Sequence, residues 1–168
     1  KCHIKKQKPF TASMKRGVVL EEEALQEYCK TYNLDFHDVQ FPGFTRHPRL
    51  EYVGGVPDGI YFIGGESVLI EVKCPSKFTP DDTVPTFYEN QIQVYLHIFG
   101  IKKGYYVEYI QGSGVKVLEV IRNDTWWKWV LPIIKSFWEE VEYWRENDIE
   151  NSPLYPHKNM FKAVENKN

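Results

Sequence analysis

Long apolar runs, paired cysteines and a strong net charge are all missing from this sequence of 168 residues. No run approaches the roughly 20 apolar residues that a membrane span needs, and the first residues are polar, unlike those of a signal peptide. The three cysteines form no CxxC pair and no even-numbered framework, which favours reduced thiols. We therefore expect an intracellular globular protein without a membrane partner.

The formal net charge is −2 at pH 7, and it is unevenly distributed. The total argues weakly against a nucleic-acid partner, because DNA-binding proteins usually carry a basic surplus. Residues 1–16, however, hold six Lys and Arg and no acid, whereas acids gather at 21–23 and 139–150. A basic arm with an acidic metal pocket would give this total, and so would a solvated basic terminus without a partner. Charge leaves both interpretations open.

Composition indicates one folded domain. Hydrophobic residues make up 42% of the chain and aromatic residues 15%, and neither repeats nor a long linker divide it. We expect a single domain over 1–168. Its expected parts are a basic arm at 1–13, a core at 14–123, an aromatic helix at 124–147 and a tail at 148–168.

The spacing of apolar residues predicts three helices and several short strands. The predicted helices span 15–32, 86–99 and 124–145. The predicted strands span 36–47, 50–53, 59–63, 67–73, 104–110 and 115–121. Tight turns are expected at 54–55 and 64–65, and the last helix should be capped by Asp124 or Thr125 and kinked at Pro132. This order of elements favours an α/β (α+β) fold, a mixed sheet with helices packed on it.

The most informative segment for chemistry is Val56-Pro57-Asp58-Gly59 followed by Leu69-Ile70-Glu71-Val72-Lys73. Because side chains alternate along a strand, Glu71 and Lys73 share one face. Charges on an apolar strand cost much free energy to bury unless they are paired or bind a metal. A hairpin could bring Asp58 beside Glu71, and two carboxylates with a backbone carbonyl suit Mg²⁺. A structural Glu–Lys pair beside an ordinary Asp-Gly turn accounts for the spacing equally well.

The first predicted helix carries an acidic residue on its apolar side. Taking 100° per residue, Glu21 falls near the centre of the stripe that includes Leu25 and Tyr28. Glu22 falls at the edge of this stripe, and Glu23 points away from it. A carboxylate on a buried face needs a partner, and a metal or a lysine would serve.

The second predicted helix carries a similar polar residue. Gln91 shares a face with Tyr88 and Tyr95, whereas Gln93 points the opposite way. Taken singly, Gln91 and Glu21 could each be a core polar residue with satisfied hydrogen bonds. Both nevertheless occur in the order that a site around Glu71 would require.

Together these motifs resemble the lambda-exonuclease or YqaJ-like viral recombinase branch of the PD-(D/E)XK nucleases. The resemblance covers roughly 3–145 and implies a restriction-endonuclease-like core. Its motifs are Thr11-Ala12-Ser13, Gly17-x-x-x-Glu21, Pro57-Asp58-Gly59, Leu69-Ile70-Glu71-Val72-Lys73-Cys74-Pro75 and Gln91-x-x-x-Tyr95. The most specific part is Glu-x-Lys-Cys-Pro following Pro-Asp-Gly.

The resemblance implies a Mg²⁺ site in which Mn²⁺ could substitute. Its ligands would be Asp58, Glu71, the carbonyl of Val72 and Glu21. Lys73 would act on the attacking water.

The resemblance also implies a catalytic role for Gln91, with Tyr95 supporting it. A pocket for a 5′ phosphate would use Ser13, Lys6 and Arg16. The chain departs from the family where Lys6 replaces an arginine and where Ser13 almost adjoins the Gly-x-x-x-Glu motif. It departs again where Val56 replaces a serine.

Members of the family degrade linear double-stranded DNA from the 5′ end, often as a ring of three subunits. They commonly work with a single-strand annealing protein in viral or phage recombination. We therefore expect a Mg²⁺-dependent, alkaline-exonuclease-like enzyme acting 5′→3′ in the host cell of a virus or phage. The alternatives are a structure-specific or RecB-like endonuclease on the same fold, and a non-catalytic DNA-binding module. An iron–sulfur version of the RecB-like class would need four cysteines, one more than the chain has.

Overall fold

The computed structural model describes residues 12–147, and it describes side chains from residue 19 onward. The chain divides into two compact units, one over Pro9–Trp127 and one that includes the residues from Lys128 onward. The first unit contains the described strands and the first two helices. In the described part of the chain, no helix is long and apolar enough to cross a membrane.

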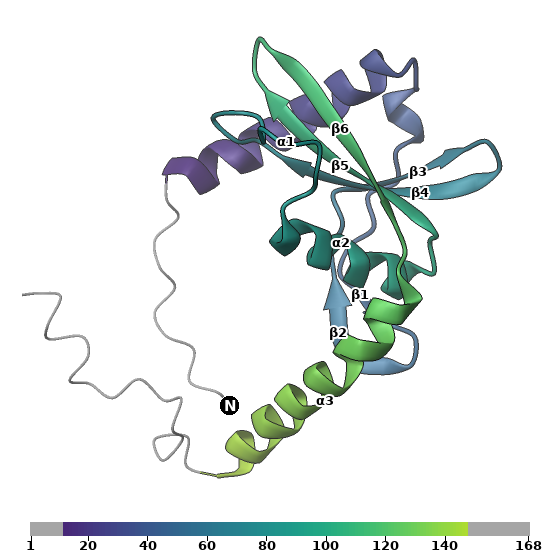
Figure 1. Ribbon diagram of the computed structural model, residues 1–168. Coiled ribbons are helices and arrows are strands. Elements are labelled where there is room, and N and C mark those ends of the chain that lie inside the picture. The colour runs from purple at the N-terminus through teal and green to yellow at the C-terminus, as the bar shows by residue number, and fades with distance from the viewer. Residues whose placement is uncertain (1–11, 148–168) are drawn as a thin grey trace, which may run out of the picture. The chain divides into compact units, whose positions relative to one another are not determined.

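A mixed sheet of four strands lies at the centre of the first unit (Figure 1). Its strands, in spatial order, are β3 (Gly59–Ile63), β4 (Glu66–Lys73), β5 (Lys103–Ile110) and β6 (Gly114–Ile121). The pairing of β4 with β5 is parallel, and the two outer pairings are antiparallel. A separate antiparallel pair consists of β1 (Thr45–His47) and β2 (Leu50–Gly55). The expected mixed sheet is therefore confirmed.

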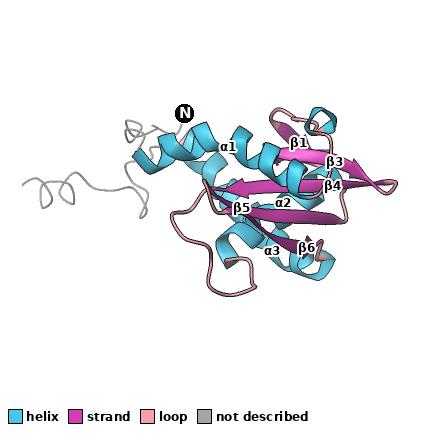
Figure 2. Ribbon diagram, turned by 90° about the horizontal axis from the view of Figure 1, so that it is seen from above, coloured by secondary structure: helices cyan, strands magenta, loops and turns pink. Residues whose placement is uncertain are grey.

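Two helices cover the two faces of this sheet (Figure 2). Helix α1 (Ala12–Thr31) packs against Ile70 and Val72, and helix α2 (Thr86–Phe99) packs against Leu69. Neighbouring side chains of β4 thus point into two different hydrophobic cores, as alternation along a strand requires. Because both faces are covered, β4 is buried over most of its length.

Residues with positive φ end several of these elements. Asn33 has φ of 53° just after α1, and the N–H of Leu34 donates to the carbonyl of Cys29 at 2.8 Å. This closes the helix where the sequence predicted a stop. Gly64 and Gly65 have φ of 59° and 86° and form the two-residue turn between β3 and β4. Such turns favour glycine because both central residues need positive φ.

The strand predicted over 36–47 is wrong in most of its length. A 3₁₀ helix, η1, spans Phe36–Asp38, and only Thr45–His47 belongs to a strand. Between them, Gln40 makes an isolated bridge to Ile60 of β3. This bridge connects the middle of the segment to the edge of the four-stranded sheet.

The turn predicted at Gly54-Gly55 is also wrong, because both glycines belong to β2. A Cβ atom at Gly54 would overlap the ring of Phe44, and one at Gly55 would overlap the ring of Tyr95. The glycines therefore make room for aromatic rings that approach the strand, a use of glycine known in strand interiors.

Helix α3 spans Asp124–Glu146, includes Pro132, and begins within the first unit. Its cap is Asn123 and not Asp124 or Thr125, because Asn123 Oδ1 accepts from the N–H of Trp126 at 2.9 Å. The ring of Trp127 stacks on His97 at 4.5 Å and on His47 at 5.7 Å. These contacts fix the start of α3 to the core.

Replacement of Ile92 by alanine tests the packing of α2 on the sheet. Ile92 is fully buried beside Leu69 and Tyr106, so Ile92→Ala should lower the free energy of unfolding by about 2–5 kcal/mol in urea denaturation. The matched control is Phe87→Ala in the same helix, since Phe87 is 77% exposed and should contribute within about 0.5 kcal/mol. Equal losses in the two variants would contradict this packing.

Candidate active site

The β3–β4 hairpin brings Asp58 beside Glu71. Gly59 pairs with Ile70 across the hairpin, so Asp58, one residue earlier, lies opposite Glu71. Oδ2 of Asp58 accepts a hydrogen bond from the N–H of Val72 at 2.7 Å. The side chain of Asp58 is thus attached to the end of β4, where the sequence placed it.

Glu71 is a carboxylate buried inside the sheet, with 1% of its surface exposed. Lys73 Nζ donates to Glu71 Oε1 and, at 3.0 Å, to the carbonyl of Val72. Glu71 Oε2 has no partner, and no other buried side-chain oxygen or nitrogen of the described residues shares that condition. A buried oxygen without a donor costs free energy that a bound cation would recover.

The carboxylates around β4 resist ionisation. Burial, and then the charge of Asp58, raise the pKa of Glu71 to about 7. Burial also raises the pKa of Asp58, against the lowering effects of Lys73 and of the Val72 N–H. Burial tends to lower the pKa of Lys73, but Glu71 and Asp58 outweigh it and the net shift is upward. The two carboxylates of Asp58 and Glu71 therefore carry more negative charge than the single ammonium of Lys73 compensates.

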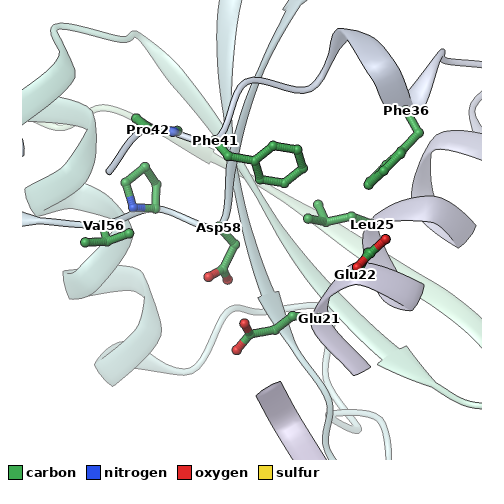
Figure 3. Close-up of a pocket in the computed structure, with 9 residues that line it drawn as sticks. Glu21, Glu22, Leu25, Phe36, Phe41, Pro42, Val56 and Asp58 are labelled. Carbon is green, nitrogen blue, oxygen red and sulfur yellow. The ribbon is translucent and has the colours of Figure 1, made fainter. Parts of the chain in front are cut away.

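Helix α1 adds Glu21 to this group from the side. Burial and the charge of Asp58 raise the pKa of Glu21, whereas Lys73 lowers it. Figure 3 shows the carboxylates of Glu21 and Asp58 directed into the same space. Glu22 is exposed and accepts from Gln26 one turn later. The helical phase predicted from the sequence places Glu21 correctly.

The expectation that Glu23 points away from the core is wrong. Its carboxylate accepts from the hydroxyl of Tyr109 at 2.6 Å and from Nε2 of Gln111 at 3.1 Å. Because α1 lies along the sheet, a residue on its flank reaches the end of β5. Glu23 is therefore part of the helix–sheet contact.

Helix α2 brings Gln91 and Tyr95 to the opposite side of the group. Gln91 Nε2 donates to the hydroxyl of Tyr95 at 2.9 Å. Burial raises the pKa of Tyr95, the bond from Gln91 lowers it, and the charges of Glu71 and Asp58 raise it again. Tyr95 therefore lies within electrostatic reach of both carboxylates. Gln93 points elsewhere, as predicted, and bonds to the carbonyl of Ile121 at 2.7 Å.

Three supporting residues, Tyr88, Tyr106 and Glu108, were not singled out from the sequence. Tyr88 lies under Lys73, with Nζ 5.3 Å from the ring centroid, and stacks on Tyr106 at 5.6 Å. Tyr106 donates to buried Glu108 at 3.0 Å, and Glu108 also accepts from the N–H of Thr79 at 2.9 Å. The signal for Glu108 was available, because it is a charged residue in an apolar strand, as Glu71 is.

A pocket of about 530 Å³ opens beside Glu21 and Asp58. Val56, which stands where the resemblance implies a serine, lines it and adds an apolar surface. The remaining lining residues are Glu22, Leu25, Phe36, Phe41, Pro42 and Pro57. Figure 3 shows the rings of Phe36 and Phe41 on the side of the pocket away from Glu21.

The structure does not describe the side chains of the residues expected to hold a 5′ phosphate. Lys6 lies outside the described residues. Ser13 and Arg16 belong to the first turns of α1, and their side chains also lie outside what the structure describes. Their placement beside the carboxylates stays a prediction.

The oxygen donors at the end of β4 suit a hard cation. Asp58, Glu71 and the Val72 carbonyl offer only oxygen, and Glu71 Oε2 has no other partner. Within the described residues, no group of three or more His, Cys, Asp or Glu side chains is arranged to hold a metal ion. Mg²⁺ does not need such a cage, since it usually binds one or two carboxylates and keeps several waters. The residues present therefore fit Mg²⁺, which keeps part of its water shell, better than a metal ion whose ligands all come from the protein.

Solved structures share this architecture. The alkaline exonuclease of Laribacter hongkongensis has a TM-score of 0.70 and 25% identity, over 79% of this chain and 70% of its own. The structure of its complex with dAMP has a TM-score of 0.67 and 24% identity, over 82% of this chain and 72% of its own. A phage-related exonuclease of Haemophilus somnus 129PT has a TM-score of 0.55 and 12% identity, over 71% of this chain and 66% of its own. The likeness to these exonucleases confirms the restriction-endonuclease-like fold.

A comparison with curated protein sequences found no match. In contrast, the family model of the YqaJ-like viral recombinase domain matches residues 1–102. The matched part includes Glu21, Asp58, Glu71, Lys73 and Gln91, which are the residues that the sequence motifs had singled out. This chain belongs to the family of YqaJ-like viral recombinase domains.

Proposed function

We propose that this protein is a Mg²⁺-dependent exonuclease that hydrolyses linear double-stranded DNA in the 5′→3′ direction. Exonuclease activity on DNA is supported by family membership and by the likeness to an alkaline exonuclease at 25% identity. The observation that carries the proposal is the buried Glu71 carboxylate, with one oxygen paired to Lys73 and the other without a donor beside Asp58. The direction of digestion rests on the family resemblance alone.

In this proposal Asp58, Glu71 and the Val72 carbonyl would hold Mg²⁺, for which Mn²⁺ can substitute, and Glu21 would complete the site from α1. When bound, the ion lowers the pKa of a coordinated water and offsets charge on a phosphate oxygen. Asp58 is already oriented for this task by its bond from the N–H of Val72 at 2.7 Å. Glu21 approaches from α1, so closure of the site depends on the packing of that helix against the sheet.

Lys73 supplies the positive charge of the chain itself. Its ammonium lies against Glu71 and the Val72 carbonyl, and the ring of Tyr88 lies 5.3 Å away. Three donors on one ammonium allow Lys73 to keep these contacts while it orients a water or a phosphate oxygen. Gln91, held by Tyr95 at 2.9 Å, adds a neutral polar group on the same side.

The expected 5′-phosphate pocket consists of Ser13, Lys6 and Arg16. A hydroxyl and two cationic side chains would hold the terminal phosphate by charge-assisted hydrogen bonds, so that a following phosphodiester reaches the carboxylates. A lysine at position 6 binds phosphate as a point charge and lacks the bidentate fork of arginine. A homotrimer and a single-strand annealing partner belong to the same proposal, and family resemblance is their support.

Asp58→Asn and Glu71→Gln should each lower the rate of DNA digestion by more than about a hundredfold. Residues that merely support a metal ligand are worth about 10–100-fold, so loss of a ligand should cost more. The measurement is digestion of a labelled linear duplex in Mg²⁺, with circular dichroism to verify folding. Retention of a tenth of the wild-type rate by either variant would contradict the proposed metal site.

Glu21→Gln should reduce the turnover number by about tenfold or more, because Glu21 shares the site of Asp58. Two neighbours serve as matched controls. Glu22→Gln changes an exposed residue, and Glu23→Gln keeps an acceptor for Tyr109 and Gln111. Both controls should stay within about twofold of wild type in the same assay. Similar losses in all three variants would refute a specific role for Glu21.

The protein should digest linear duplexes with a 5′ phosphate about tenfold faster than those with a 5′ hydroxyl, at low substrate concentration. The estimate follows from one or more hydrogen bonds to a charged phosphate, each contributing about 1.5–3 kcal/mol. Lys6→Ala and Ser13→Ala should reduce this preference. Lys30→Ala, an exposed lysine paired with Glu27 at the far end of α1, should not. Rapid cutting of closed circles would instead identify an endonuclease.

A further inference from the structure

The pocket beside the candidate active site has two chemically different sides. One side carries the carboxylates of Glu21 and Asp58, and the other carries the rings of Phe36 and Phe41 (Figure 3). The two rings lie 5.9 Å apart, centroid to centroid, at 60°. Phe41 is 58% exposed, so it contributes little to the core and has its surface free for a ligand.

The backbone holds both aromatic residues firmly. Gln40 exchanges two hydrogen bonds with Ile60 of β3, at 2.8 and 2.9 Å, which fixes the residue just before Phe41. Phe36 begins η1, whose cap Asp35 accepts from the N–H of His37 at 2.9 Å. The N–H of Asp35 in turn donates to the hydroxyl of Tyr61 at 3.1 Å. The rings are therefore presented by segments attached to the sheet, next to the carboxylates.

The chemistry of the pocket selects among the parts of a nucleotide. Among the described residues that line it, none is Lys, Arg or His, so its aromatic side offers no charge to a phosphate. Pro42 and Val56 extend the apolar surface next to Phe41. A flat, weakly polar group with a π face suits such a wall, and the nucleobase is the group of DNA with these properties. The volume of about 530 Å³ lies within the roughly 300–1,000 Å³ of sites that enclose small molecules.

We propose that this pocket receives a single unpaired nucleobase, next to the phosphodiester at the carboxylates, and that Phe41 stacks on it. The inference rests on the proposed nuclease function. Inside a duplex both faces of a base are covered by its neighbours and its edge is paired, so only a base that has left the stack can enter. The end of a duplex must therefore open before cleavage, and an end whose first pair is mismatched should be the better substrate.

Fluorescence of 2-aminopurine tests the pocket without relying on cleavage. The probe is a linear duplex with a 5′-phosphorylated overhang of two unpaired nucleotides, one of which is 2-aminopurine at the first or the second position, so that duplex neighbours do not already quench it. It is bound to the full chain in Ca²⁺ in place of Mg²⁺. Wild-type protein should quench the fluorescence at one of these positions, because stacking on an aromatic ring quenches it. Phe41→Leu, which keeps an apolar side chain but removes the ring, should abolish the quenching.

Steady-state digestion in Mg²⁺ supplies the second readout. Phe41→Leu should raise KM about tenfold while changing kcat little, in line with the usual contribution of one stacked base. Phe62→Leu is the matched control, since Phe62 is 63% exposed on β3 and does not line the pocket. It should retain wild-type quenching and KM. Melting curves verify that both variants fold.

The outcomes separate the inference from the function on which it rests. If wild type digests DNA and Phe41→Leu keeps both its quenching and its KM, the base pocket is refuted and the nuclease stands. If wild type digests no DNA, the proposed function fails. In that case, quenching by wild type that Phe41→Leu loses still supports a base pocket, and quenching that both proteins share, or that neither gives, overturns it.

Discussion

Burial of the Glu71 carboxylate inside β4 is the constraint on which the surrounding structure depends. With 1% of its surface exposed, this side chain has lost its hydration, and one oxygen finds Lys73 while the other finds no donor. Asp58 lies close enough to raise the pKa of Glu71 further. A cation shared by the two carboxylates would remove both costs at once, which is the physical reason for the metal site proposed above.

Covering β4 on both faces turns this buried charge into a site with several contributors. Helix α1 brings Glu21 from one side, and helix α2 brings Tyr88, Gln91 and Tyr95 from the other. Each helix does so from its own face of the sheet. The parallel pairing of β4 with β5 requires a long crossover, and α2 is that crossover. The topology itself thus brings Tyr95, with Gln91 bonded to it, within electrostatic reach of Glu71.

Sequence patterns predicted the structure correctly where the interactions that decide it lie between residues close together in the chain. The glycine turn at Gly64-Gly65 sets the hairpin register, and this register brings Asp58 to Glu71. The helical phase likewise depends only on neighbouring residues, and it correctly predicted that Gln91 and Gln93 point to different sides of α2. The errors arose from contacts distant in the chain. Glu23 was expected to point away from the apolar stripe because its partners, Tyr109 at the end of β5 and Gln111 in the following turn, lie far away in the chain. The glycines of β2 were expected to form a turn because the rings that approach them also come from distant residues.

The glycine at position 55 has a consequence for how this enzyme can change over time. Its missing side chain is the space that the ring of Tyr95 occupies, and Tyr95 in turn holds Gln91. Any larger residue at 55 displaces that ring, so a substitution in the small β1–β2 sheet would disturb the proposed active site. Sequence change at this outlying position would thereby be tied to the proposed role of Gln91, and a compensating change would have to occur at Tyr95 on a different element.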